Sequence, residues 1–220
     1  MDKKSLYKII LVDDHIVLRD ALAALINKFD GLQVIAVSAN GSEMIDQISK
    51  GNLPDLVILD LNMPVMDGYA STAWLQDNHP SVKILVLTMF DSEIALIRLL
   101  QSGVRGFLKK DVHPDELKTA ILSVAEDGYY YSNSTTGKLA SVFHKSRVSR
   151  SPFQKAMLTD KEIEFLKLAS TDMTYKAIAQ AMKLTPRAID GCRDGLFDKL
   201  DVKSRVGLAI YAVKNGIINF

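Results

Sequence analysis

The 220-residue sequence contains one cysteine, Cys192, and no long apolar run. One cysteine cannot form an internal disulfide, which excludes the disulfide-rich secreted scaffolds and fits a reducing compartment. A membrane-spanning helix needs roughly 18 to 20 apolar residues, and no stretch of the chain approaches that length. The first residues lead straight into an apolar segment that ends in Asp13 and Asp14, which is too short and too acidic for a signal peptide. These absences predict a cytoplasmic protein without membrane contact.

The motifs of the common α/β enzymes are also missing. The chain has no Gly-rich phosphate loop, no G-x-S-x-G nucleophile elbow and no His/Cys cluster with metal-ligand spacing. Its four histidines, at positions 15, 79, 113 and 144, are scattered. They fit helix caps and surface positions, so no chemistry is assigned to them. The sequence therefore disfavours a free-standing α/β enzyme.

The net charge of +1 is the sum of an acidic first segment and two basic segments. Residues 1–128 carry 12 basic and 18 acidic side chains, and residues 157–220 carry ten basic and eight acidic ones. The segment between them, residues 129–156, carries five basic side chains and no acidic one. This distribution predicts two domains with different partners, joined by a basic linker. Taken alone, the basic segment is best explained as a solvated connection.

Residues 1–128 alternate between short apolar segments and segments with helical spacing. The apolar segments are continuous, which is typical of strands covered on both faces. Five strand–helix units in succession predict an α/β fold with a doubly wound, parallel, five-stranded sheet. Residues 129–134 leave this pattern. The expected strands cover residues 9–12, 34–37, 56–59, 84–87 and 106–108, and the expected helices cover residues 16–29, 42–49, 68–77, 92–102 and 114–126.

From residue 158 onward the sequence predicts only helices. Thr159 and Glu162 match a capping box, and Thr185 followed by Pro186 begins a longer helix with the proline at its first position. The layout is that of a helix-turn-helix module, although a plain four-helix bundle for protein contacts explains the pattern equally well. The expected helices cover residues 159–170, 174–182, 186–200 and 203–215, and residues 137–144 also allow a short helix.

Carboxylates follow two predicted strands at the point where each strand ends. Asp13 and Asp14 close the first strand, and Asp60 closes the third. In a parallel sheet these ends share one edge, where ligands bind. Converging carboxylates repel unless a cation neutralises them, and oxygen ligands suit Mg²⁺. Thr88 and Lys110, at the ends of the fourth and fifth strands, add a hydroxyl and a cation that can bind phosphate. Singly, each residue is better explained as a cap or a surface residue; together, the five indicate a phosphate-handling site.

Residues 6–128 resemble the receiver domains of two-component signalling. The likeness rests on ILVDDH at 10–15, LDLNMPVMDG at 59–68, LT at 87–88 and GFLKKD at 106–111. It implies a flavodoxin-like fold in which Asp60 takes a phosphoryl group from a histidine kinase. It also implies that Asp14, Asp60 and the backbone carbonyl of Asn62 bind Mg²⁺, with Asp13 reaching the ion through water.

The same resemblance implies a switch. Lys110, counted from Phe107 by the family's spacing, would hold the phosphoryl oxygens. Thr88 would be drawn toward them, and the vacated space would admit Phe107, which shifts the surface where partners bind. Met89 stands where the family has a small residue, which predicts slow attack by water and a long-lived phosphorylated state. The protein would catalyse only its own phosphorylation and dephosphorylation.

Residues 158–218 resemble the LuxR-type output domain of the NarL/FixJ class of regulators. The likeness rests on LT, Glu162 and Leu166, on KAIA at 176–179, LTPRAI at 184–189 and KLDVKSR at 199–205. It implies that the helix over residues 186–200 recognises double-stranded DNA and that the last helix mediates dimerisation. The implied DNA-facing residues, mostly phosphate contacts, are Lys176, Thr185, Arg187, Lys199, Lys203 and Arg205.

The expected recognition helix departs from the family pattern. Asp190 replaces a lysine that commonly faces the groove, and Cys192 replaces a histidine. Glycines at positions 191 and 195 each cost about 1 kcal/mol of helix stability relative to alanine. Asp190 and Asp194 bring negative charge toward DNA, although a carboxylate can accept from cytosine N4. Arg193 is the best candidate for a base or phosphate contact.

Two functions therefore stay open. The first is a phosphorylation-controlled transcription regulator that binds DNA as a homodimer, with half-sites about 34 Å apart. The second is a phosphorylation-gated regulator whose C-terminal domain binds a protein partner instead of DNA.

Overall fold

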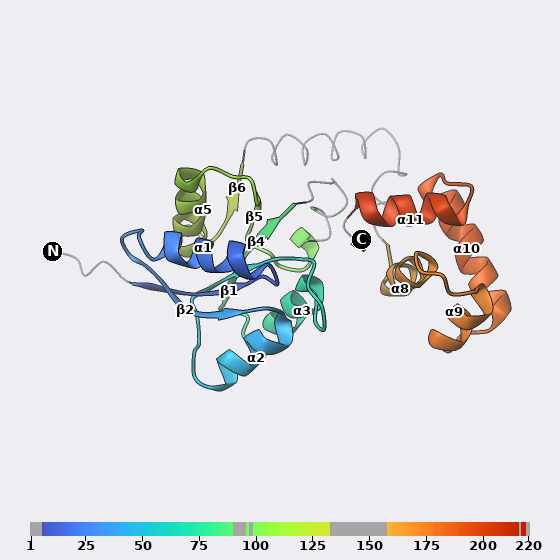
Figure 1. The fold of residues 1–220 in the computed structure, drawn as a ribbon, viewed down its shortest axis with the longest axis horizontal. Helices are drawn as coiled ribbons and strands as arrows, with labels where there is room; N and C mark the ends of the chain where they lie inside the picture. Colours follow the sequence, from blue (N-terminus) through green and yellow to red (C-terminus); the bar gives the residue numbers. More distant parts are fainter. Residues whose placement is uncertain (1–5, 90–95, 97–98, 133–157, 216, 219–220) are drawn as a thin grey trace. The chain divides into compact units, whose positions relative to one another are not determined.

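The computed structural model describes residues 6–89, 96, 99–132, 158–215 and 217–218 (Figure 1). These residues fall into two compact units, which are described separately. The sheet unit contains all the strands with helices α1, α2, α3 and α5, and the helical unit contains α8 to α11. The helix allowed over residues 137–144 and most of the first half of the one expected over 92–102 lie outside the described residues. In the part of the chain that the structure describes, no helix is long and apolar enough to cross a membrane.

The sheet unit is a doubly wound α/β fold, as predicted. Every strand pair is parallel, and the strand order is β2-β1-β3-β4-β5-β6. The strands are β1 (Tyr7–Val12), β2 (Leu32–Ser38), β3 (Leu56–Leu59), β4 (Lys83–Thr88), β5 (Gly106–Lys109) and β6 (Tyr130–Tyr131). The helices are α1 (Ile16–Ile26), α2 (Gly41–Ser49), α3 (Gly68–Asn78) and α5 (Pro114–Glu126).

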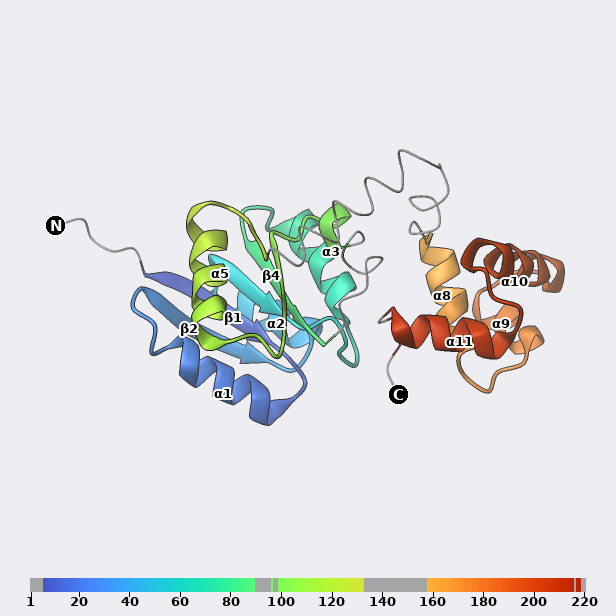
Figure 2. The ribbon, with the colours of Figure 1, turned by 90° about the horizontal axis from the view of Figure 1, so that it is seen from above.

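The core explains why the strand segments are continuously apolar. Side chains alternate between the two faces of a strand, and in β1 both Ile9 and Ile10 are fully buried. Ile9 and Leu11 belong to a core cluster that includes Ile26 of α1 and Leu117 of α5. Figures 1 and 2 show α1 and α5 on one side of the sheet and α2 and α3 on the other. Both faces of the sheet are therefore covered, as the sequence predicted.

The sheet has a sixth strand that the sequence analysis did not predict. β6 pairs in parallel with β5, so that Tyr130 lies opposite Gly106 and Tyr131 opposite Phe107. The Tyr130 hydroxyl donates to Glu116 Oε1 at 3.1 Å, and the Tyr131 hydroxyl donates to the backbone oxygen of Val104 at 3.3 Å. The expectation that residues 129–134 leave the sheet pattern was wrong for these two residues, because a strand this short has no readable periodicity.

The helical unit consists of α8 (Asp160–Ala169), α9 (Tyr175–Ala181), α10 (Pro186–Leu200) and α11 (Arg205–Lys214). The predicted capping box is present: Thr159 Oγ1 accepts from the backbone N–H of Glu162, and the Glu162 carboxylate accepts from the backbone N–H of Thr159. Thr185 caps α10 in the same way, by accepting from the Ala188 N–H. The four helices enclose a separate apolar core with Phe165 fully buried at its centre.

Candidate functional site

The three predicted carboxylates converge at one edge of the sheet. Asp13 follows β1 and Asp60 follows β3, and both are almost fully buried, with relative exposures of 2% and 4%. The backbone N–H of Asp60 donates to the oxygen of Val12, so pairing of the two strands continues to the point where the carboxylates emerge. One ligand atom from each of Asp13, Asp14, Asp60 and His15 lies within 4.8 Å of the others. We refer to these four residues as the acidic cluster.

Lys110 binds two members of the acidic cluster. Its ammonium lies 2.8 Å from Oδ2 of Asp13 and 2.9 Å from Oδ2 of Asp60, and its side chain is only 4% exposed. Its backbone N–H donates to the oxygen of Thr88 at 3.0 Å. The structure therefore brings together the ends of β1, β3, β4 and β5 at one point, as the sequence predicted.

Burial affects the pKa values of both Asp60 and Lys110. Desolvation raises the pKa of Asp60 above its usual value, even though Lys110 acts in the opposite direction. For Lys110, desolvation alone would lower the pKa, but hydrogen bonds and attraction from Asp13 and Asp60 outweigh it and raise the pKa. One ammonium thus pairs with two buried carboxylates, and additional positive charge near Asp60 would stabilise its ionised form.

The loop after β3 is held close to Asp60 by Asp67 and Gly68. Asp67 caps α3 by accepting from the Ala70 N–H at 2.9 Å. A Cβ on Gly68 would collide with the backbone oxygen of Asp60 and would lie 2.7 Å from the Cα of Leu61, so only glycine permits this approach. Asn62 lies half-buried in this loop. Its predicted carbonyl contact with a metal ion stays a prediction.

The predicted switch residues lie on neighbouring strands. Thr88 ends β4 and is fully buried, and Val86 of the same strand pairs with Phe107 of β5. The ring of Phe107 is buried in this structure and not turned toward solvent. Its movement on phosphorylation stays a prediction. Met89 is 71% exposed and stands directly after Thr88, at the rim of the site.

His15 is the residue of this site that the sequence analysis missed. Its Nδ1 atom lies 3.0 Å from Oδ1 of Asp13 and 3.0 Å from Oδ1 of Asp14. It occupies the N-cap position of α1, but its side chain makes no cap hydrogen bond. Of the other histidines, His113 does cap a helix, by accepting from the Asp115 N–H. The position of His15 directly after two aspartates was the signal that could have been used.

The donor set fits a divalent cation. Carboxylate oxygens are preferred ligands of Mg²⁺, and a cation would relieve the repulsion among Asp13, Asp14 and Asp60. Oδ1 of Asp14 is buried, and although Nδ1 of His15 lies 3.0 Å from it, it accepts no hydrogen bond of suitable geometry from the residues that the structure describes. An orphaned buried oxygen of this kind costs free energy unless another group coordinates it. The acidic cluster is therefore compatible with a divalent metal site.

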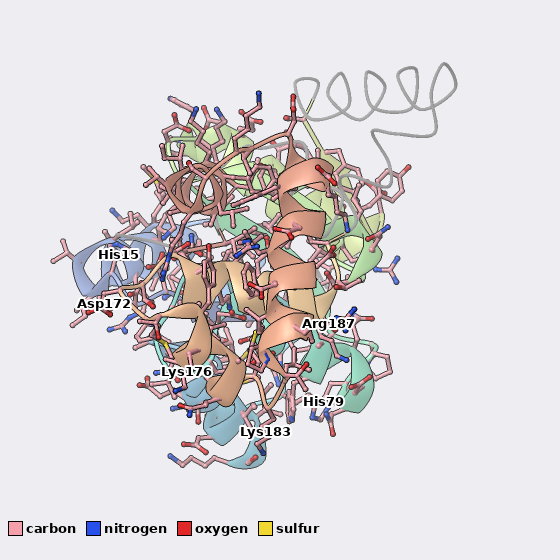
Figure 3. All side chains as sticks on the ribbon, turned by 90° about the vertical axis from the view of Figure 1, so that its right-hand side faces the viewer. His15, His79, Asp172, Lys176, Lys183 and Arg187 are labelled. Carbon is pink, nitrogen blue, oxygen red and sulfur yellow. The ribbon has the colours of Figure 1, made fainter. Side chains whose placement is uncertain are left out.

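In the helical unit, exposed basic side chains surround the turn between α9 and α10. Lys176 lies in the first turn of α9, Lys183 in the turn that joins α9 to α10, and Arg187 in the first turn of α10 (Figure 3). Lys183 has a positive φ of 52°, and it was not among the predicted contacts. Lys203, just before α11, is also exposed.

Arg193, the predicted base or phosphate contact, is bound within its own unit. Its guanidinium lies 2.8 Å from Oδ1 of Asp194 and 3.0 Å from Oδ1 of Asp190. It also lies over the ring of Tyr175, 5.4 Å from the centroid, which is cation–π distance. To contact DNA, this side chain would have to exchange both carboxylates for phosphate or base acceptors.

Two further predicted DNA contacts have structural partners. Arg205 donates to three backbone oxygens at and after the C-terminal end of α8, those of Ala169, Thr171 and Met173, at 2.8, 2.7 and 2.5 Å. Lys199 binds both carboxylate oxygens of Glu162 at 2.9 and 2.8 Å. These groups hold the helices of the unit together, and their contact with phosphate stays a prediction.

Two family models match the chain, in the same order as the two units. The model described as response regulator receiver domain matches residues 9–122, and the model described as bacterial regulatory proteins, luxR family, matches residues 156–212. The chain belongs to the two-component response regulators. The regulator thus combines a receiver domain, which contains the acidic cluster, with a LuxR-type DNA-binding domain, which contains the helical unit.

Its relatives match it from end to end. The oxygen regulatory protein NreC of Staphylococcus haemolyticus is 30% identical over 219 residues, which cover 97% of the regulator and 100% of the relative. The transcriptional regulatory protein LnrK of Bacillus subtilis is 30% identical over 219 residues, with coverages of 97% and 99%. These relatives are transcriptional response regulators of the same two-domain organisation.

The fold of the regulator is also that of solved response regulators. The structure of RcsB from Salmonella enterica serovar Typhimurium, bound to a promoter in the presence of phosphomimetic BeF₃⁻, has a TM-score of 0.70 at 22% identity and covers 95% of the regulator and 99% of that chain. The response regulator ChrA of a heme-sensing system has a TM-score of 0.52 at 26% identity, with coverages of 98% and 100%. The first of these likenesses is evidence for the fold alone.

The exposed face of α10 in the regulator is acidic. Asp190, Asp194 and Asp198 follow one another at four-residue spacing, so they lie on one side of the helix. The glycines at positions 191 and 195 are exposed, and a Cβ on either would meet no atom within 4 Å. Cys192 is half-buried, and burial raises the pKa of its thiol, so it faces the interior as a neutral group. The other two basic side chains of the helix, Arg193 and Lys199, are paired with carboxylates, whereas Arg187 at its start is exposed.

Proposed function

We propose that the regulator accepts a phosphoryl group on Asp60 from a histidine kinase. The single observation that carries this proposal is the buried Asp60 carboxylate, 2.9 Å from the Lys110 ammonium, at the edge where four parallel strands end. Lys110 would bind the oxygens of the incoming group and offset its charge while Oδ of Asp60 attacks. Thr88, whose backbone oxygen already accepts from Lys110, would supply a hydroxyl to the product.

We further propose Mg²⁺ as the cofactor. Asp14, Asp60 and the backbone carbonyl of Asn62 would hold it, with Asp13 contributing through water, and the ion would neutralise charge on the phosphoryl group. The orphaned oxygen of Asp14 supports this assignment. The regulator would catalyse only its own phosphorylation and dephosphorylation, and its single cysteine supports action in the cytoplasm.

Phosphorylation would control binding of double-stranded DNA by the helical unit. Lys176, Lys183, Arg187 and Lys203 are exposed and would contact phosphates. Thr185 caps the helix by accepting from the Ala188 N–H and would place the positive end of the helix dipole toward the backbone of DNA. We propose that the phosphorylated regulator binds as a homodimer. The exposed apolar side chains Val206 and Ile210, four residues apart on α11, support a contact between two copies.

The test is fluorescence anisotropy of the full-length protein with a pooled promoter library, with and without beryllofluoride and Mg²⁺, over a salt series. We expect tighter binding with beryllofluoride, and no such gain in Asp60→Asn. Each phosphate contact contributes about −0.9 to the slope of log K against log salt. Lys176→Ala should therefore reduce the slope by about 1 per contact, whereas Lys214→Ala, an exposed lysine at the end of α11, should leave it unchanged.

A protein partner is the second candidate function. The observation that favours it is the row of Asp190, Asp194 and Asp198 on α10, with Arg193 already paired to the first two. If neither state binds DNA while Asp60 still accepts beryllofluoride, the DNA-binding proposal fails. A basic protein surface would then be the target of the acidic face.

A further inference from the structure

The acidic cluster contains a nitrogen donor that its proposed role does not use. His15 Nδ1 lies 3.0 Å from Oδ1 of Asp13 and 3.0 Å from Oδ1 of Asp14. Its backbone is fixed on both sides, because its N–H donates to Oδ1 of Asp13 at 2.9 Å and its carbonyl accepts from the Arg19 N–H at 2.9 Å. The ring is therefore held at the mouth of the cluster by the start of α1.

The imidazole has no other task in the described structure. It makes no cap hydrogen bond for α1, and its side chain is 64% exposed, so it is not part of the core. Nδ1 donates to Oδ1 of Asp13, because a carboxylate can only accept, while the buried Oδ1 of Asp14, also 3.0 Å from Nδ1, accepts no hydrogen bond from the residues described. A cation that replaced the Nδ1 proton, with the ring proton on Nε2, would contact both the orphaned oxygen and the ring nitrogen.

The donor set decides which cation fits best. Three carboxylates suit Mg²⁺ and Mn²⁺ alike, whereas a neutral imidazole is a poor ligand for Mg²⁺ and a good one for first-row transition ions. We propose that His15 is a direct ligand in this site and makes it select a transition cation such as Mn²⁺ over Mg²⁺. This inference deepens the proposed metal site and rests on it.

The competing explanation is that His15 only positions Asp13 and Asp14 by hydrogen bonding. Glutamine can donate and accept hydrogen bonds from a similar distance but offers no imidazole nitrogen. His15→Gln should therefore restore a positioning role without a nitrogen ligand, and its amide oxygen, which suits Mg²⁺ and Mn²⁺ alike, should not restore a preference for Mn²⁺. His79→Ala is the matched control, because His79 follows the far end of α3, at the opposite edge of the sheet.

The experiment uses the full-length protein with Mn²⁺ as the probe. Electron spin echo modulation of bound Mn²⁺ detects a directly coordinated imidazole nitrogen, and EPR titration gives the Mn²⁺ affinity. Competition with Mg²⁺ gives the selectivity. We expect nitrogen modulation in the wild type and in His79→Ala, and none in His15→Ala or His15→Gln. Mn²⁺ affinity should fall by about ten-fold or more in both His15 variants, the scale of losing a ligand or its support, while Mg²⁺ affinity stays within about two-fold.

Each other result counts against the proposal in a distinct way. Binding of Mn²⁺ without nitrogen modulation, or modulation that persists in His15→Ala, would refute His15 as a ligand and leave the proposed metal site intact. Recovery of the preference for Mn²⁺ over Mg²⁺ in His15→Gln would refute the imidazole as its source and assign the residue to positioning. Failure of the wild type to bind either cation would overturn the proposed metal site together with the inference.

Discussion

Replacing Gly191 and Gly195 by alanine should stabilise the helical unit by about 2 kcal/mol. Each glycine inside a helix costs about 0.8 to 1.0 kcal/mol relative to alanine, and both lie in the interior of α10. A Cβ on either would meet no atom within 4 Å, so no steric cost offsets the gain. The two positions share no contacting side chain, and their effects should therefore add.

Gly207 supplies the control for this prediction. It lies in the first turn of α11, where a Cβ would come within 3.1 Å of the Cβ of Val202. Gly207→Ala should therefore gain less than either α10 variant, or lose stability. Hydrogen exchange of the α10 amides in the full-length protein measures the change, and thermal unfolding of this unit should shift by about 4 to 8 °C per kcal/mol.

The reasoning would be refuted if the double variant were no more stable than the wild type, or if Gly207→Ala stabilised the unit equally. The same variants separate stability from recognition. If α10 must approach DNA closely through its glycines, DNA affinity should fall as stability rises, and anisotropy would record the loss. Unchanged affinity would mean that α10 does not use these positions for contact.

Three further predictions concern single side chains. Arg205→Lys should destabilise the helical unit by about 3 kcal/mol, because a lysine cannot reproduce the guanidinium's three hydrogen bonds to carbonyl oxygens. Hydrogen bonds of charged groups contribute about 1.5 to 3 kcal/mol each. Denaturant unfolding measures the change, and a loss below about 0.5 kcal/mol would contradict it. Desolvation raises the pKa of Glu162, but hydrogen bonds from Lys199 and Thr159 outweigh it and hold the pKa below its ordinary value. The contribution of Glu162 to the free energy of unfolding is therefore complete above the unfolded-state pKa of about 4.3 and is lost as pH falls through the lower folded-state pKa. The stability of Glu162→Gln should depend less on pH in this window. An equal pH dependence of stability in the variant and the wild type would contradict the assignment. Met89→Ala should shorten the life of the phosphorylated state by admitting water, which the decay of phosphoprotein measures; a wild-type half-life of only seconds would refute the shielding role.

The sheet and the convergence of the carboxylates could be predicted from the sequence, because both follow from short-range rules. Continuous apolar segments are typical of strands buried on both faces. Once the strands are parallel, their ends share an edge, so Asp13, Asp60 and Lys110 had to meet there. The capping box of Thr159 is likewise local, since its two residues lie three positions apart.

The features that were missed depend on side-chain direction or on distant partners. The ring of His15 turns toward Asp13 and Asp14; its position directly after these two aspartates hinted at this, but a helix cap fits the same position. Arg205 donates to carbonyls more than 30 residues earlier in the chain, which no pattern of residue types encodes. The pairing of Arg193 with Asp190 and Asp194 was also not predicted, although both neighbours on α10 are visible in the sequence; its contact with DNA stays a prediction.

β6 anchors the chain to β5 where it leaves the sheet. Tyr131 is the register partner of Phe107, and its hydroxyl is tied to Val104 just before β5. Tyr130 and Tyr131, near the start of the basic linker, thus pair with the strand that carries Phe107 of the proposed switch. A displacement of β5 would therefore move β6 and change the direction in which the chain leaves the sheet. The phosphorylation state of Asp60 would then affect the linker through the paired backbones of β5 and β6.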